Sequence, residues 1–410
     1  MVDVPGSLPP SAPGRSVGPG CSYAAPVRPE LSTPRYGNAA LADLMPSVLA
    51  ALGVDGEPAA LALPAMSRVV VLLVDGLGWE LLCDHPEAAP FLTSLAGRPL
   101  TTGFPSTTVT SLASFGTGLT PGQHGLTGYT SWVHEVDATV GWLGWTPTGR
   151  HEDLRTRLVP EDLQPHPTVF ERAEAAGVSV TVAAPAHFQG SGLTRAILRG
   201  GLYRGAVTPG DAVALAAEGS LRGDRSLVYC YTPDLDLTGH VRGVDSDAWL
   251  SQLVLVDRYA EALAGRLPAG TVLLVTADHG MVDVAEEHRV DFDAEPALQQ
   301  GVRVLAGEPR ARHVHVEPGA ADEVLAAWSA ALGDRMWVGG RDDAVAAGLF
   351  GPVVSVEAHH RIGDVVAVAT GEVAVVQRQV DPMMSGLLGQ HGALTDAERL
   401  VPLLSSGDPA

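Results

Sequence analysis

The sequence contains no lysine, and all 26 of its basic residues are arginines. Without a lysine amine the chain cannot form a Schiff base, and it lacks the lysine with which a P-loop contacts nucleotide phosphates. Acidic residues outnumber the arginines, 47 to 26, which gives a formal net charge of −21. This charge argues against a nucleic-acid duplex or an anionic membrane surface as the main partner.

Cysteine is also scarce. Cys21, Cys83 and Cys230 are far apart, form no Cys-x-x-Cys metal motif and suit a reducing compartment. No apolar run approaches the roughly 18 residues of a membrane-spanning helix. The segment 1–35 is rich in proline, glycine and serine, and it lacks the basic stretch and apolar run of a secretory signal. We therefore expect a soluble, cytoplasmic protein with no membrane partner.

Hydrophobic residues make up 46% of the chain, enough for a large core, and they are arranged in short runs. Residues 69–74, 226–231 and 271–276 are largely apolar runs typical of strands buried on both faces, and 179–183 reads as a further strand. Helical periodicity separates them, for example over 168–176 and 247–267. Alternating strands and helices predict an α/β fold, in which helices cover both faces of a mainly parallel central sheet.

The pattern changes between residues 290 and 380, where short strands and helices follow one another without long apolar runs. We predict three parts: a flexible N-terminal arm over 1–36, a catalytic α/β core over 37–289 and 381–410, and a small α+β insertion over 290–380 that covers an edge of the sheet.

Acidic and imidazole side chains follow three of the predicted strands. In open α/β sheets, ligands bind at the carboxyl ends of the strands. A further histidine lies near the C-terminus, so that the candidate metal ligands are Asp75, Asp236, His240, Asp278, His279 and His391. Mixed aspartate and histidine ligation suits Zn²⁺, Mn²⁺ or Fe²⁺, and six ligands are more than one catalytic ion uses. Two ions that share them could activate a nucleophile and hold the oxygens of a transferring group.

The segment Gly103–Gly125 contains a cluster of hydroxyls. Pro105 disfavours a helix at the residue before it, and Ser106, Thr107 and Thr108 can then cap a helix over 109–115. A helix N-terminus favours an anion, so one of these hydroxyls is a candidate nucleophile toward a phosphorus or sulfur ester. The other interpretation is an ordinary Ser/Thr cap.

Six motifs occur in order along the chain: Val74-Asp75-Gly76, Phe104-Pro105-Ser106-Thr107-Thr108, Thr117-Gly118-Leu119 with His124-Gly125, Asp236-Leu237-Thr238-Gly239-His240, Ala277-Asp278-His279-Gly280 and Gln390-His391-Gly392. As an ordered set they resemble the alkaline phosphatase superfamily, in particular its nucleotide pyrophosphatase/phosphodiesterase (type I phosphodiesterase) branch. The resemblance extends over about residues 68 to 395.

This resemblance implies two divalent metal ions, usually zinc, with manganese as the alternative. One ion is then held by Asp236, His240 and His391. The other is held by Asp75, Asp278, His279 and the nucleophile oxygen. The family nucleophile lies three residues after the proline, which matches Thr108, with Thr107 as the second candidate. Its attack on phosphorus would give a phospho-threonine intermediate, and the implied substrate is a small phosphate ester or a nucleotide.

The sequence departs from the family pattern at Tyr129. The branch usually has an asparagine there, whose amide holds a phosphate oxygen, but the only asparagine of this chain is Asn38. The Tyr129 hydroxyl either replaces that amide or packs against the pocket wall. The aromatic stretch 129–145 either stacks on a substrate group or packs in the core.

Several functions are compatible with these residues. A phosphodiesterase or nucleotide pyrophosphatase fits the motifs, and the alternatives are a phosphomonoesterase of the same superfamily or a catalytically inert binding protein. A sulfatase is disfavoured because the chain lacks the Cys/Ser-x-Pro-x-Arg setting of that branch. A phosphoglycerate-mutase-like isomerase is disfavoured by the ligand order and the absence of lysine.

Overall fold

A computed structural model describes residues 31–333 and 335–407 of the chain. Most of the predicted arm, 1–36, lies outside the described residues. Its last residues contact the rest of the protein. The Arg35 amide donates to Thr101 Oγ1 at 2.8 Å, and the Tyr36 hydroxyl donates to the Leu349 carbonyl at 2.8 Å.

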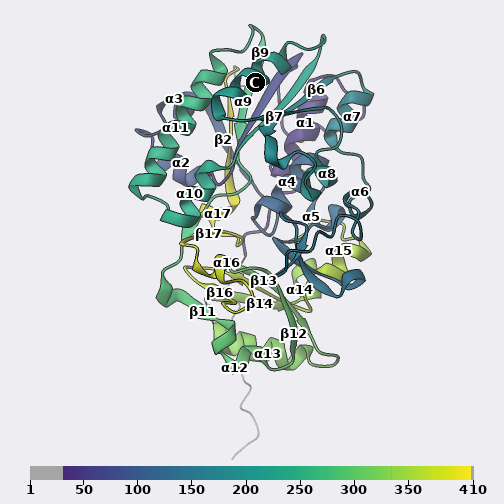
Figure 1. The fold of residues 1–410 in the computed structure, drawn as a ribbon, viewed down its shortest axis with the longest axis vertical. Coiled ribbons are helices and arrows are strands. Elements are labelled where there is room, and N and C mark those ends of the chain that lie inside the picture. The colour runs from purple at the N-terminus through teal and green to yellow at the C-terminus, as the bar shows by residue number, and fades with distance from the viewer. Residues whose placement is uncertain (1–30, 334, 408–410) are drawn as a thin grey trace, which may run out of the picture.

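The centre of the molecule is a seven-stranded sheet (Figure 1). Strand β1 pairs in parallel with β8 and β9, and β6 pairs in parallel with β7 and β8, whereas β18 is antiparallel to β2 and β9. The predicted α/β fold with a mainly parallel sheet is therefore confirmed. In spatial order the strands are β2 (Ala96–Thr101), β18 (Leu400–Ser405), β9 (Thr271–Thr276), β1 (Arg68–Val74), β8 (Ser226–Thr232), β6 (Ser179–Pro185) and β7 (Leu202–Ala206).

Two groups of helices pack around this sheet, and Figure 1 shows them on its two sides. One group consists of α3 (Pro90–Ser94), α9 (Pro209–Ser220), α10 (Asp234–Arg242) and α11 (Asp247–Ala264). The other consists of α1 (Leu44–Ala51), α4 (Thr108–Thr117), α7 (Val169–Ala175) and α8 (Gly192–Ile197). Shorter helices are α2 (Trp79–Asp84), α5 (Pro121–His124), α6 (Pro160–Leu163) and α17 (Asp396–Arg399). None of the described helices is long and apolar enough to cross a bilayer.

The insertion has its own sheet and its own apolar core, below the central sheet in Figure 1. Its four strands run in the spatial order β12 (Val302–Glu308), β13 (Ala311–Val316), β15 (Val365–Ala369) and β14 (Met336–Gly340). The helices of this part are α12 (Pro296–Gln299), α13 (Ala321–Leu332), α14 (Arg341–Ala346) and α15 (Val356–Arg361). We keep the boundaries 290 and 380 of the insertion as a proposal.

Two two-stranded sheets lie where the chain enters and leaves the insertion. The pairs are β10 (Val282–Asp283) with β17 (Gly389–Gln390), and β11 (Arg289–Asp291) with β16 (Ala374–Val376). Helix α16 (Pro382–Gly386) precedes β17. A three-stranded sheet of β3 (Thr130–Val133), β4 (Ala138–Gly141) and β5 (Thr146–Pro147) contains part of the aromatic stretch. Trp142 and Trp145 of that stretch are fully buried, which fits core packing.

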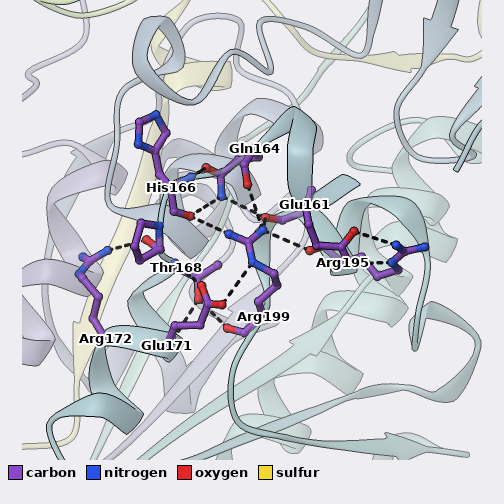
Figure 2. A network of polar contacts seen from close by, with 10 residues as sticks. Glu161, Gln164, His166, Thr168, Glu171, Arg172, Arg195 and Arg199 are labelled. Atoms are coloured by element: carbon purple, nitrogen blue, oxygen red, sulfur yellow. Dashed lines mark hydrogen bonds and ion pairs between the residues drawn. The ribbon is translucent and has the colours of Figure 1, made fainter. Parts of the chain in front are cut away.

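An arginine network fixes the helices beside α4 (Figure 2). Arg199 donates to the carbonyls of Gln164, His166 and Ala196, and Arg195 pairs with Glu161 at 2.7 Å. Arg172 of α7 donates to the Thr117 carbonyl at 3.0 Å. This last bond satisfies a carbonyl in the final turn of α4, and it thereby fixes the helix that begins at Thr108.

Candidate active site

Helix α4 begins one residue earlier than the predicted 109, at Thr108 itself. The predicted hydroxyl cap is wrong, since no side chain caps this helix. Instead the Ser106 hydroxyl donates to the Ala393 carbonyl at 2.6 Å, and Thr108 Oγ1 lies 3.1 Å from His279 Nε2. The hydroxyl of Thr108 is therefore directed toward the histidine, at the first turn of a helix whose backbone N–H groups favour an anion.

Three aspartates converge near Thr108, each with one oxygen that lacks a partner. Asp75 follows β1, Asp278 follows β9, and Asp236 lies in α10. Asp75 Oδ2 accepts the Tyr231 hydroxyl, and Asp278 Oδ1 accepts the Gly76 amide at 3.2 Å. Asp75 Oδ1, Asp236 Oδ1 and Asp278 Oδ2 are buried without a hydrogen-bond partner. Buried acceptors without a partner are costly, so these oxygens need a ligand.

Asp236 and His240 follow β8, and the structure places both in helix α10. The sequence of this helix suits its dipole, because Asp234 and Asp236 lie in the first turn and His240 and Arg242 in the last. In a helix, residues i and i+4 share one face. His240 Nε2 therefore lies 3.4 Å from Asp236 Oδ2.

The three histidines share one hydrogen-bond pattern. In each, Nδ1 contacts a backbone carbonyl: His240 with Gly389 at 2.7 Å, His279 with Gly280 at 2.9 Å and His391 with Ser106 at 2.9 Å. A carbonyl only accepts, so Nδ1 carries a proton, and Nε2 is the ring nitrogen that a neutral imidazole offers to a ligand. Histidines that bind metal are held in this way.

The structure contains two groups of possible metal ligands, and within each group the donor atoms lie within 4.8 Å of one another. One group is Asp236, His240 and His391, and the other is Asp75, Asp236 and His279. Asp278 Oδ2 lies 3.7 Å from His279 Nε2. The rings of His279 and His391 stack with centroids 3.6 Å apart. The structure thus brings together all six candidate ligands and Thr108, and Asp236 lies between the two groups.

Burial dominates the electrostatics of the cluster. It raises the pKa of Asp236 to about 8, assisted by the charge of Asp75, and it raises the pKa of Asp75 together with the charge of Asp278. Burial lowers the pKa of His279 to about 4 and that of His391 well below its usual range. The protein thus holds neutral imidazoles beside carboxylates that repel one another, an arrangement that a cation stabilises.

The donor set fits divalent cations. It consists of imidazole nitrogens and carboxylate oxygens, and the free cysteines Cys83 and Cys230 are not part of it. Such ligands suit Zn²⁺ and Mn²⁺. The three unpartnered carboxylate oxygens and the three available Nε2 atoms provide six donors.

Tyr129 is placed differently. Within the described residues, no hydrogen bond or ion pair joins it to the six ligands or to Thr108. Its backbone N–H donates to Glu308 Oε2 at 2.8 Å, and burial raises the pKa of its hydroxyl to about 12. Glu308 belongs to the insertion, so this part of the molecule fixes the backbone at the position of the family asparagine.

Sequence reasoning missed two residues around the site, Tyr231, which donates to Asp75, and Glu398, whose carboxylate accepts the Ala393 amide at 3.0 Å. It named Ser106 only as a member of the hydroxyl cluster, whereas in the structure the Ser106 carbonyl contacts His391. Only Glu398 has a local signal, because Thr395-x-x-Glu398 matches a capping box. The other contacts join segments that are distant in sequence.

Fold and site together define an α/β protein of the alkaline phosphatase type, with aspartate–histidine clusters able to hold metal at the carboxyl ends of parallel strands. The sequence matches the type I phosphodiesterase/nucleotide pyrophosphatase family over residues 69–394, and the chain belongs to that family.

Solved structures with the same fold include murine ectonucleotide pyrophosphatase/phosphodiesterase 5, at 20% identity and a TM-score of 0.65, which covers 82% of this chain and 87% of the murine chain. An inactive variant of the murine protein in complex with AMP has 19% identity, a TM-score of 0.64 and the same coverage. The human protein has 20% identity and a TM-score of 0.63, with 83% and 88% of the two chains covered. No curated protein matches the sequence significantly.

Proposed function

We propose that this protein is a phosphodiesterase or nucleotide pyrophosphatase that uses two divalent metal ions and Thr108 as its nucleophile. The main observation is that three Nε2 atoms and three unpartnered carboxylate oxygens gather beside one threonine hydroxyl. Family membership supports the reaction class.

Asp236, His240 and His391 would hold one ion, and Asp75, Asp278, His279 and Thr108 Oγ1 the other. Zinc is the metal we favour, with manganese as the alternative, because both accept this donor set. The bound cations would neutralise the carboxylates, lower the pKa of the threonine hydroxyl and stabilise charge on the phosphoryl oxygens.

In the first step, Thr108 Oγ1 gives its proton to water and attacks phosphorus in line. The Oγ1–P bond forms while the bond from phosphorus to the leaving oxygen breaks, the leaving oxygen takes a proton from water, and phospho-threonine remains. The free N–H groups at the start of α4 stabilise the phosphoryl charge. In the second step, water attacks phosphorus, the Oγ1–P bond breaks, and the Thr108 hydroxyl is regenerated.

The substrate we favour is a nucleotide with a phosphodiester or pyrophosphate bond: the family supports the bond type, and a structural neighbour solved in complex with AMP supports the nucleotide. The Tyr129 hydroxyl would contact a phosphate oxygen in place of the family asparagine amide.

The test is to purify the protein without chelator, measure bound zinc and manganese, and compare turnover of bis-p-nitrophenyl phosphate with that of p-nitrophenyl phosphate. We expect bound metal and faster turnover of the diester. Faster turnover of the monoester would favour a phosphomonoesterase. Absence of both metal and turnover would overturn the proposal in favour of an inert binding protein.

A further inference from the structure

A fully buried ion pair connects the insertion to the segment that carries His391. Arg310, in the turn between β12 and β13, contacts Glu398 of α17 through two parallel bonds, Nε to Oε1 at 2.7 Å and Nη2 to Oε2 at 2.8 Å. Both side chains are completely buried. Arg310 Nη1 also donates to the carbonyls of Gly371 and Val373, each at 2.9 Å. A bidentate pair with further bonds to both partners is geometrically well defined.

Glu398 contacts the loops of two candidate metal ligands. Its Oε1 accepts the amide of Ala393, two residues after His391, at 3.0 Å. Its backbone carbonyl accepts the amide of Gly280, next to His279, at 2.8 Å. Thr395 donates its hydroxyl to Oε2 at 2.5 Å, so each carboxylate oxygen accepts two hydrogen bonds.

The two histidines in question belong to different candidate ion sites, and their rings stack with an angle of 16° between their planes. From the other side, the Ser106 hydroxyl donates to the Ala393 carbonyl at 2.6 Å. The His391 segment is therefore held between Ser106, two residues before Thr108, and Glu398. A shift of Ala393 would move the imidazole of His391 relative to both His279 and Thr108.

We propose that Arg310 and Glu398 are positioning residues for the metal centre, through which the insertion sets the relative placement of His279 and His391. This inference rests on the proposed function. Glu398 acts through two acceptors: its carboxylate accepts the Ala393 amide, and its backbone carbonyl accepts the Gly280 amide. Arg310 acts by neutralising and orienting the Glu398 carboxylate.

One variant distinguishes a positioning role from a purely structural role of this ion pair, because the two roles predict different metal affinities for it. The double variant R310M/E398M removes both charges and fills their volume, so the part of the stability loss in R310M or E398M that comes from one unpaired buried charge should be reversed. It still deprives the Ala393 amide of its acceptor. If the pair positions the histidines, metal affinity remains low in the double variant although stability recovers.

The experiment measures the unfolding midpoint of the chelator-treated full-length protein, and the Zn²⁺ dissociation constant by competition with a chromophoric chelator. We expect R310M/E398M to bind Zn²⁺ about 10- to 100-fold more weakly than the wild type, the usual cost of losing a group that orients a metal ligand. E398Q keeps an oxygen for the Ala393 amide, and its affinity should stay closer to that of the wild type.

The matched control is R341M/D364N, which removes another ion pair of the insertion, 2.6 Å long, that does not contact the C-terminal segment. Its Zn²⁺ affinity should equal that of the wild type. Wild-type affinity in R310M/E398M would overturn the positioning role and leave the proposed function intact. Failure of the wild type itself to bind Zn²⁺ or Mn²⁺ would overturn both.

Discussion

Thr107 and Thr108 are adjacent hydroxyls in different surroundings. Thr107 is the N-cap residue of α4 and is almost completely buried, whereas Thr108 Oγ1 lies 3.1 Å from His279 Nε2. We predict that Thr108→Ala lowers kcat by about 10³-fold or more, because the variant lacks the hydroxyl that forms the covalent intermediate. Bound zinc, measured by elemental analysis, should be largely retained, since the aspartates and histidines remain.

Thr107→Ala is the matched control, and it should keep most of the activity. If Thr107→Ala abolishes turnover and Thr108→Ala does not, the nucleophile is assigned to the wrong threonine.

Glu308 provides a pH-dependent prediction. Burial raises its pKa from 4.5 to about 8, although the Tyr129 amide and the charge of Arg312 oppose this shift, and Glu398 adds to it. The folded state thus favours the protonated carboxyl. Its contribution to stability is full below about pH 4.5 and is lost as the pH rises through about 8.

Glu308→Gln removes this titration and keeps an oxygen for the Tyr129 amide. We expect the stability of the variant relative to the wild type to increase between about pH 5 and 8, by at most about 1.4 kcal/mol per pH unit, and then to level off. Urea unfolding of both proteins across this range measures the difference, in which all other titrating groups cancel. A difference that does not vary with pH would contradict the assigned shift.

At the scale of elements, the position of α10 depends on a glycine at the end of β1. Gly76 has a φ of +75°, and a Cβ placed there would lie 2.9 Å from the Cα and Cβ of Asp236. Gly76→Ala should therefore displace α10 and with it Asp236 and His240. We predict that Zn²⁺ affinity, measured by chelator competition, falls about tenfold or more.

Gly56→Ala separates this crowding from backbone strain. Gly56 has a φ of +81°, and no atom lies within 4 Å of its added Cβ. Both variants should lose about 1–2 kcal/mol of stability from the left-handed conformation, but only Gly76→Ala should lose metal affinity. Equal affinities in the two variants would show that α10 tolerates the methyl group.

The sequence predicted the strands well because buried parallel strands are nearly continuous apolar runs, as in 69–74 and 271–276. It did not predict α10, since Asp234, Thr238 and Gly239 have low helix propensity, and the helix forms because its end charges and its packing against α11 stabilise it. The predicted cap of α4 failed for a related reason. Ser106 bonds to Ala393, which is distant in sequence, instead of the adjacent helix.

At the scale of the whole molecule, the motifs named the candidate ligand residues that the structure brings together, whereas the contacts that hold these residues could not be predicted. Glu308 and Tyr129 are 179 residues apart, and Arg310 and Glu398 are 88 residues apart. The hydrophobic periodicity of a single sequence gives no information about contacts between residues so far apart. The link between the insertion and the centre of the site is therefore visible only in three dimensions.

Bringing the candidate ligands together also lowers the stability of the whole folded protein. Without a cation, three buried carboxylates destabilise the fold. The pKa of Asp236 indicates this, because it rises from its usual 3.8 to about 8, so that this carboxyl ionises less readily in the folded protein. Cations that bind only the folded state should reverse this. A concentration 100-fold above the dissociation constant adds about 2.7 kcal/mol for each site.

Two opposite changes are therefore predicted for Asp236→Asn, which removes a charge without changing the volume of the side chain. In excess chelator at pH 8, the variant should unfold at a higher temperature than the wild type, because a mutual repulsion is gone. In excess Zn²⁺, the wild type should be the more stable protein, since only it has the carboxylate that lies between both candidate ion sites. Calorimetric melting curves of the two proteins under both conditions test whether the order of their melting temperatures reverses. A wild type whose melting temperature does not respond to chelator would be inconsistent with cations bound at these residues.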